Sequence, residues 1–260
     1  MIVNTQRLFT SLLPTLRIGA VCDVGSMNGA DAMLFSAAVP HGSVYAFEPN
    51  PLNFRLMQAN RALQERDIQL VPLAATNYDG EADFFLVEAE YSSGDPRRGM
   101  SSLYQRTGEW GSSAAVRVKT VRLDTFLADK CPVHARLALW IDTEGQAYEV
   151  IDGLGSLAQQ VRVLHIEVET SPCIGANQKL YPEVKSLLQR LGFRELATDQ
   201  SPSQIQFNAL FVRPERSPLM KLRVAVLSVR ARLRHITGRA IYRACPWCLA
   251  RYRAMRLRRS

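Results

Sequence analysis

The sequence has no apolar run of about 18 residues, the length expected of a membrane-spanning helix. The apolar stretch LFTSLLPTL near the start lacks a basic region and a small-residue cleavage site, so we expect no signal peptide. Only five of 260 residues are cysteine, and they are too dispersed for a disulfide framework. With 47% hydrophobic and 22% charged residues, the chain is globular by composition, and we expect it in the cytoplasm.

Acidic residues are absent from the end of the chain. Residues 216–260 contain 13 Lys and Arg and no Asp or Glu, whereas residues 1–215 contain 19 basic and 24 acidic residues, a net charge of −5 (19 − 24). Pro214, Ser217 and Pro218 lie at the boundary, where a linker is expected. We therefore divide the chain into a main domain, residues 1–215, and a basic extension, residues 216–260, which we expect to be helical.

Short runs rich in β-branched residues alternate with segments of helical spacing along the main domain. Strands are expected in 19–25, 43–49, 68–75, 82–87, 115–121, 137–142, 161–169, 193–198 and 206–212, and helices in 30–39, 53–64, 146–152 and 179–190. Because parallel neighbouring strands need a crossover, this alternation predicts an α/β fold with a parallel sheet and helices on both faces.

Acidic residues stand where several of these strands end. They are Asp23, Glu48, Asp142 with Glu144, and Glu167. Each alone is also what a solvated strand terminus would show. Open α/β sheets bind ligands at the carboxyl ends of their strands, so together these acids indicate a pocket. Its ligand would offer hydroxyls and a positive charge, or its chemistry would need a base.

The turn DVGSMNG, residues 23–29, places Gly25 and Gly29 between a strand and a helix, as a nucleotide-binding loop does. It is not G-x-G-x-x-G, because Met27 takes the place of the middle glycine, which disfavours a pyrophosphate there. Glu48 follows at about the 20-residue spacing of an acid that binds ribose hydroxyls. The pattern predicts a nucleoside without pyrophosphate; the alternative is a glycine turn followed by an acidic helix cap.

Several segments together resemble the FkbM-type S-adenosylmethionine-dependent methyltransferases. They are VCDVGSMNGADA, VYAFEPNP, LVPLAATNYDGEADFF, VRLDTFL, LWIDTEGQAYEVIDG and LHIEVE. The resemblance covers roughly residues 18–213. It implies the class I methyltransferase fold, a Rossmann-like sheet of seven strands with the last antiparallel. It also implies O-methylation of a hydroxyl on a sugar, a glycan or a secondary metabolite.

By this resemblance, S-adenosylmethionine is the cofactor. The cofactor-binding residues that it implies are Asp23, Gly25, Asn28, Gly29, Glu48, Pro49, Ala74 and Ala75. The loop of residues 23–29 would hold the methionine portion, Glu48 the ribose, and the strand end at residues 74–75 would pass the adenine. Met27 departs from the family's asparagine, and Asn28 follows one place later.

The resemblance also implies the catalytic residues Asp142, Glu144 and Glu167, with the first two facing the transferred methyl group. A base that accepts the hydroxyl proton typically accelerates such a reaction by about 10² to 10⁴. Asp142 is the first candidate and Glu167 the alternative, while Glu144 would orient the substrate or anchor the following helix. The three could bind a divalent cation. Ala147 stands where the family often has a further acid, and we expect no metal.

Two other features have alternative interpretations. The long polar segment of residues 88–114 is assigned to the substrate side, or else to a surface loop. Its candidate contacts are Arg97, Arg98, Tyr104 and Trp110. His165 lies inside an apolar strand and is predicted to be a core histidine rather than a catalyst.

The basic extension carries one apolar stripe at helical spacing: Leu222, Val226, Val229, Leu233 and Ile236. Such a helix could dock on the domain, pair with another chain, or lie on an anionic membrane at the inner face. Nucleic acid is a competing partner that the acidic main domain disfavours. Cys245 and Cys248 have redox or half-zinc spacing without a second pair nearby. The alternative function is therefore a catalytically idle relative that acts through this extension on a membrane or a nucleic acid.

Overall fold

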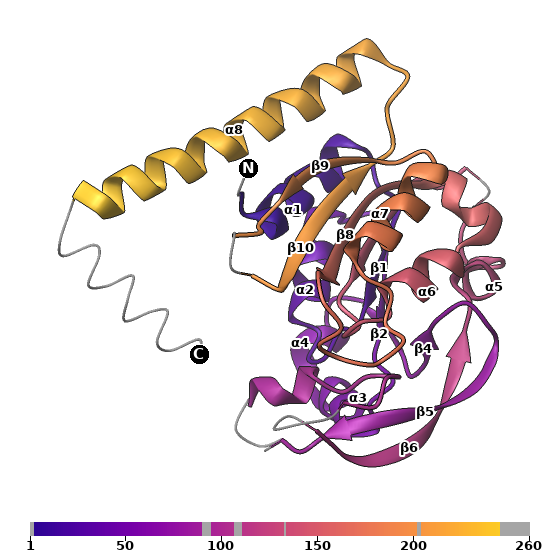
Figure 1. Cartoon of the computed structure of the whole chain (residues 1–260). Coiled ribbons are helices and arrows are strands. Elements are labelled where there is room, and N and C mark those ends of the chain that lie inside the picture. The colour runs from indigo at the N-terminus through magenta and orange to yellow at the C-terminus, as the bar shows by residue number, and fades with distance from the viewer. Residues whose placement is uncertain (1–2, 90–94, 107–110, 133, 202–203, 245–260) are drawn as a thin grey trace.

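The computed structural model describes residues 3–89, 95–106, 111–132, 134–201 and 204–244, and only the backbone of residues 112–113 and 235–244. Two sheets and the helices around them make up the fold (Figure 1). Trp110, Cys245 and Cys248, for which the sequence suggested roles, lie outside the described residues. Within the described part, no helix has both the length and the hydropathy needed to cross a bilayer.

The main sheet has seven strands in the order β3-β2-β1-β7-β8-β10-β9. Their bounds are β1 Ala20–Val24, β2 Ser43–Phe47, β3 Gln69–Val71, β7 Leu137–Ile141, β8 Val161–Glu169, β9 Arg194–Thr198 and β10 Gln206–Val212. The pairs among β3, β2, β1, β7 and β8 are parallel, and β10 runs antiparallel to both β8 and β9. The predicted α/β sheet, with its last strand antiparallel, is confirmed.

Helices cover both faces of this sheet, because successive residues of a strand point to opposite sides. On one face Cys22 and Val24 join a core with α5 (Leu123–Leu127), α6 (Ala147–Asp152), η2 (Gly155–Gln159) and α7 (Tyr181–Arg190). On the other face Val21 joins a core with α1 (Thr5–Thr15), α2 (Ala30–Ala38), α3 (Pro51–Ala59) and α4 (Arg61–Gln64). The central strands β1 and β7 are fully buried, which explains their unbroken apolar runs.

Two predicted elements are each divided in the structure. The strand expected over residues 68–75 is wrong, because Pro72 has no N–H for a sheet ladder and the chain passes there from β3 to a second sheet. That sheet consists of β4 (Ala74–Ala75), β6 (Ser112–Val121) and β5 (Gly80–Val87). The single helix expected over 53–64 is also wrong. Asn60 ends α3 with extended backbone, and its side chain caps α4.

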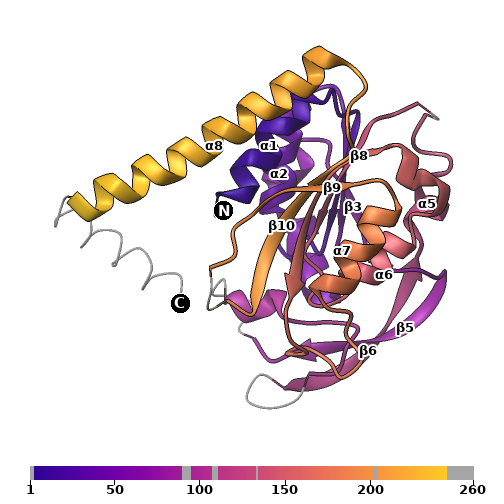
Figure 2. The ribbon, with the colours of Figure 1, turned by 45° about the horizontal axis from the view of Figure 1, so that its top comes forward.

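The first and last helices were predicted incompletely. No element was predicted at α1, although Leu8, Phe9, Leu12 and Leu13 bury one face of it. The extension forms α8 (Pro218–Ala244), and its early turns pack beside α1 at the outside of the molecule (Figure 2). The helical extension therefore shares a core with the main domain, and it does so through a face other than the predicted stripe.

Candidate active site

The loop after β1 lies against the end of β7. Gly25 has a φ of +87°, and a Cβ on it would lie 1.8 Å from the carbonyl oxygen of Asp142. The Asp142 N–H donates to the carbonyl oxygen of Val24 at 2.9 Å, which continues the pairing of the two strands. Only glycine fits at this position, so the sequence brings the glycine loop and the candidate base together.

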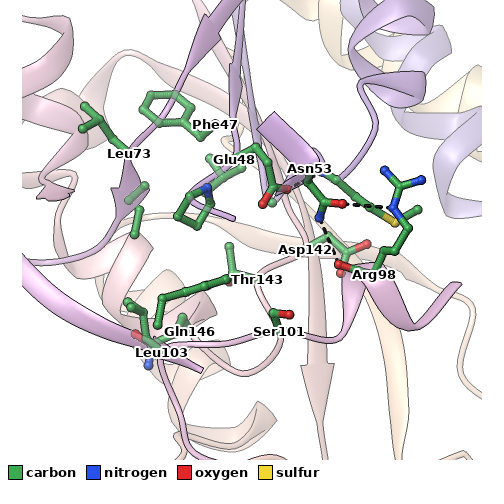
Figure 3. Close-up of a pocket in the computed structure, with 18 residues that line it drawn as sticks. Phe47, Glu48, Asn53, Leu73, Arg98, Ser101, Leu103, Asp142, Thr143 and Gln146 are labelled. Carbon is green, nitrogen blue, oxygen red and sulfur yellow. Dashed lines mark hydrogen bonds between the residues drawn. The ribbon is translucent and has the colours of Figure 1, made fainter. Parts of the chain in front are cut away.

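A cavity opens at the carboxyl edge of the sheet (Figure 3). It is lined by Val24, Gly25, Met27, Phe47, Glu48, Pro49, Asn53, Leu73, Ala74, Ala75, Phe84, Arg98, Gly99, Ser101, Leu103, Asp142, Thr143 and Gln146. Of the candidate cofactor residues, the cavity wall includes Gly25, Glu48, Pro49, Ala74 and Ala75, and it includes Asp142 as well. The cavity wall does not include Asp23, Asn28 and Gly29, nor Glu144 and Glu167.

The three loop residues outside the cavity wall organise the loop itself. Asp23 is buried and accepts a hydrogen bond from the Ser26 hydroxyl at 2.6 Å. Burial raises the pKa of Asp23 to about 8. Asn28 accepts from the first N–H of α2 at 3.0 Å, and Gly29 lies so close to Leu63 that a Cβ would approach it to 2.7 Å. Gly29 thus makes room for the Leu63 side chain of α4.

Glu48 is buried at the end of β2 and points toward the cavity (Figure 3). One carboxylate oxygen accepts from the Met27 N–H at 2.7 Å and the other from the Asn50 N–H at 2.8 Å. Burial raises the pKa of Glu48 to about 7, and these two donors and the Asn53 side chain oppose that rise. Because a carboxylate accepts about four hydrogen bonds, Glu48 retains capacity for a ligand hydroxyl.

Asp142, Glu144 and Glu167 form one cluster, with a carboxylate oxygen of each within 4.8 Å of the others. Burial raises the pKa of Asp142, and a hydrogen bond from Glu167 opposes that rise. Burial raises the pKa of Glu167 well above its ordinary value, and the charges of Asp142 and Glu144 raise it further. Burial favours the protonated form of both carboxyls, and the hydrogen bond between them raises the pKa of Glu167 and lowers that of Asp142. The oxygen donors and their spacing would also suit a divalent cation.

Glu144 has a different environment, because it forms an ion pair with Arg106. The side chain of Arg106 is 10% exposed and that of Glu144 is 15% exposed. Burial raises the pKa of Glu144 to about 7, and Arg106 counteracts this. The Ser102 hydroxyl donates to the Glu144 carbonyl at 2.7 Å. Glu144 has a φ of +50°, a strained conformation for a residue with a side chain, so these contacts hold a conformation that the backbone disfavours.

The segment of residues 95–106 packs over the cavity that is lined by the glycine loop and Glu48, which we call the cofactor-side cavity. The segment includes the short helix η1 (Pro96–Gly99). Arg98 donates from Nε to the Asn53 amide oxygen at 3.1 Å, and the Asn53 amide donates back to the Arg98 carbonyl at 3.0 Å (Figure 3). Arg97 pairs with Asp95, and the Tyr104 hydroxyl donates to Glu149 at 3.3 Å. We had assigned this segment to the substrate side, but in the structure Arg98 forms part of the cavity wall.

A second, polar cleft lies on the other side of Asp142. It is lined by Val3, Asn4, Thr5, Gln6, Trp140, Asp142, His165, Glu167, Asp199 and Asn208. His165 is buried there, stacked on Trp140 with ring centroids 3.5 Å apart, and its Nε2 lies 3.0 Å from the Thr5 hydroxyl. Burial lowers the pKa of His165 to about 3, so it is neutral near pH 7. The predicted core location of His165 agrees with the structure.

Sequence reasoning missed several of these residues. Arg106 and Asn53 follow no motif, and their contacts join positions 38 and 45 residues apart. Asp199 and Asn208 reach the polar cleft from the region of β9 and β10, and no local spacing indicates it. Met27 was noted only as a departure from a glycine pattern and from the family's asparagine, yet it contributes to the cavity wall.

The strand order and the cavity at the carboxyl ends of β1 and β2 define the class I methyltransferase fold. The model of the methyltransferase FkbM domain matches residues 23–195, about two thirds of the chain. The chain belongs to this family and is an S-adenosylmethionine-dependent methyltransferase. No curated protein matches it significantly.

Solved structures with related architecture share little sequence with the chain. A putative rRNA methylase from Clostridium thermocellum is 11% identical, with 84% of this chain and 99% of that chain covered and a TM-score of 0.47. The N-terminal domain of EvdMO1 with S-adenosylhomocysteine bound is 10% identical, with 82% of each chain covered and a TM-score of 0.45. Magnesium protoporphyrin IX methyltransferase from Synechocystis PCC 6803 is 13% identical, with 80% and 79% covered and a TM-score of 0.42.

Proposed function

We propose that the enzyme methylates a hydroxyl of a sugar, a glycan or a secondary metabolite, and that Asp142 accepts the hydroxyl proton. One observation supports this proposal above the others. Asp142 lines both the cavity beside the glycine loop and the polar cleft on its other side. A group in that position can contact a donor in one space and an acceptor in the other.

The cavity fits S-adenosylmethionine in its chemistry. Apolar side chains for an adenine ring come from Phe47, Leu73, Phe84 and Leu103, with the small residues Ala74 and Ala75 beside them. Glu48 would accept hydrogen bonds from the ribose hydroxyls. Gly25 and Met27 would hold the methionine portion next to Asp142. When bound, the cofactor supplies a methyl group on a positively charged sulfur.

The polar cleft suits a hydroxyl-rich acceptor. Its carboxyl and amide groups, from Glu167, Asp199, Asn4 and Asn208, offer hydrogen bonds to hydroxyls and no positive charge for an anion. We therefore place the acceptor in this cleft. Asp199 is already fixed from one side, since it accepts from the Asn208 N–H at 2.7 Å.

The chemical step is a displacement at the methyl carbon. The acceptor oxygen forms a bond to the methyl group, the bond from that carbon to sulfur breaks, and the hydroxyl proton passes to the Asp142 carboxylate. Glu167 would hold Asp142 in position by donating a hydrogen bond from its carboxyl group. Glu144 is occupied by Arg106 and would position the segment over the cofactor, not orient the acceptor.

Calorimetry with S-adenosylhomocysteine tests the cofactor site, and mass spectrometry of candidate acceptors incubated with S-adenosylmethionine tests the reaction. We expect a gain of one methyl group on a hydroxyl of a neutral, hydroxyl-rich compound. Methylation of an amine or of carbon in preference to hydroxyls would contradict the proposal.

A further inference from the structure

Helix α8 has two apolar faces, and the domain covers only one of them. The covered face consists of Met220, Val224, Leu227 and Ala231, which belong to the core shared with α1. Since successive helical residues are about 100° apart, a second set lies on roughly the opposite side. That set is Leu219, Leu222, Val226 and Val229, and we call it the outer face of α8.

The outer face is exposed to solvent. Leu219 and Leu222 are 59% and 61% exposed, and Val226 and Val229 are 38% and 50% exposed. Contiguous exposed apolar patches of this kind mark surfaces that bind a protein, a membrane or a ligand. The face contains most of the apolar stripe that the sequence predicted. The stripe is therefore present on the helix, but it does not pack against the domain.

Basic residues border the outer face on both sides. By helical geometry Lys221 and Arg232 lie along one edge, and Arg223 and Arg230 lie along the other. Among the residues that the structure describes, none of these four cations has an acidic partner. The whole extension of residues 216–260 carries 13 basic residues and no acidic one.

We propose that α8 lies flat on an anionic lipid surface, with its outer face in the boundary between headgroups and acyl chains. An apolar stripe between two rows of cations matches such a boundary, because the apolar side chains enter it and the long basic side chains reach anionic headgroups. The acidic main domain would stay on the solvent side, since α1 contacts the opposite face of the helix (Figure 2). Binding then requires no rearrangement of the domain.

The basic charge and the apolar outer face together favour a membrane over two other partners, a second copy of the chain and a nucleic acid. Pairing of two copies through their outer faces would bring two exclusively basic extensions together without a compensating acid. A nucleic acid backbone would satisfy the cations but would leave the four apolar side chains without an apolar partner. An anionic membrane satisfies both sets of side chains.

The full chain should be mixed with phosphatidylcholine vesicles made with or without phosphatidylglycerol, and sedimentation should measure the bound fraction. We expect binding to the anionic vesicles that weakens as salt rises, because the headgroup attraction is screened. The triple variant Leu222→Gln, Val226→Gln, Val229→Gln should lose at least about tenfold in affinity, a factor that about 1.4 kcal/mol represents. Its circular dichroism and its S-adenosylhomocysteine affinity should match the wild type.

The matched control is the triple variant Leu34→Gln, Leu52→Gln, Leu56→Gln. These leucines lie on α2 and α3 and are 50%, 38% and 41% exposed, respectively. This control should bind anionic vesicles like the wild type. A charge variant, Arg223→Gln with Arg230→Gln, should also bind more weakly than Arg55→Gln with Arg66→Gln, which removes two exposed arginines elsewhere.

Three results would overturn the proposal. One is equal binding of anionic vesicles by the outer-face variant and its control. Another is no vesicle binding, with a dimer in analytical ultracentrifugation that the outer-face variant abolishes. The third is no vesicle binding, with salt-sensitive retention of RNA.

Discussion

Arg106 and Glu144 form a largely buried ion pair that joins the segment over the cofactor-side cavity to the turn after β7. The segment supplies Arg98, Gly99, Ser101 and Leu103 to the cavity wall. Glu144 in turn follows Asp142 by two residues. The Arg106–Glu144 contact therefore connects the segment that forms part of the cavity wall to the turn that contains the candidate base.

Breaking this ion pair should weaken cofactor binding. Glu144→Gln and Arg106→Met should each lower S-adenosylhomocysteine affinity by about tenfold or more, because either change removes a largely buried ion-pair contact. The double variant should lose little beyond either single change, since both remove the same contact. Calorimetry measures all three.

The exposed pair Arg61–Glu65, with side chains 88% and 62% exposed, provides the control. Arg61→Gln should change neither affinity nor stability measurably, as expected for surface ion pairs. Additive losses in the Arg106 and Glu144 double variant would show that the two residues act separately.

Glu48→Gln should weaken S-adenosylhomocysteine binding by about 1.5 to 3 kcal/mol, because a charged acceptor is lost and the new amide faces backbone donors. Glu81→Gln, at an exposed position on β5, should have no effect. Calorimetry provides the affinities, and thermal unfolding shows whether the loop has been disturbed. An unchanged dissociation constant would remove Glu48 from the cofactor site.

The buried carboxyl of Asp23 should make stability depend on pH in a specific direction. Its folded pKa is raised to about 8, so the folded state holds its proton more tightly than the unfolded state does. The wild type should then lose free energy of unfolding as pH rises from about 4 to about 8. Asp23→Asn, which can still accept from Ser26, should lack this loss.

Urea unfolding of both proteins at about pH 6 and about pH 9 measures the difference, and other titrating groups cancel between them. Between these pH values, we expect the free energy of unfolding of the variant to rise relative to that of the wild type by about 1 kcal/mol or more, which corresponds to about one pKa unit. An identical difference at both pH values would mean that Asp23 titrates in its ordinary range.

The sequence predicted much of the sheet and the strand-end acids, because hydrophobic periodicity and strand ends are local signals. Glu48 and Asp142 directly follow β2 and β7 as expected, and Asp23 is the penultimate residue of β1. The Arg106–Glu144 contact was not predictable, since it depends on how a long segment returns to the sheet. Pro72 could have indicated the break between β3 and β4, because it has no N–H for a ladder.

Helix α8 shows a different limit. Its sequence contains two apolar stripes, and periodicity alone reports that a stripe exists without indicating which one meets the domain. The stripe through Leu222 and Val226 is the more regular, yet Val224 and Leu227 meet the core with α1. Only tertiary packing distinguishes them.

The pH profile of turnover should reflect Asp142. Burial raises its pKa, and the proton acceptor must be ionised to work. Turnover should therefore fall as pH decreases through a value above about 3.9, the ordinary pKa of aspartate. In Asp142→Asn that limb should disappear from the residual activity. A profile that keeps the same acid limb in the variant would assign it to another group.

The most direct test is the single-turnover rate of methyl transfer by Asp142→Asn, on an acceptor identified by mass spectrometry, beside its affinity for S-adenosylhomocysteine. The affinity should stay near that of the wild type, while the rate should fall by about 10² to 10⁴, the contribution typical of a general base. Glu167→Gln should have a smaller effect, because the amide can still donate to Asp142. A wild-type rate in Asp142→Asn, together with loss of transfer in Glu167→Gln, would contradict the assignment of Asp142 as the base.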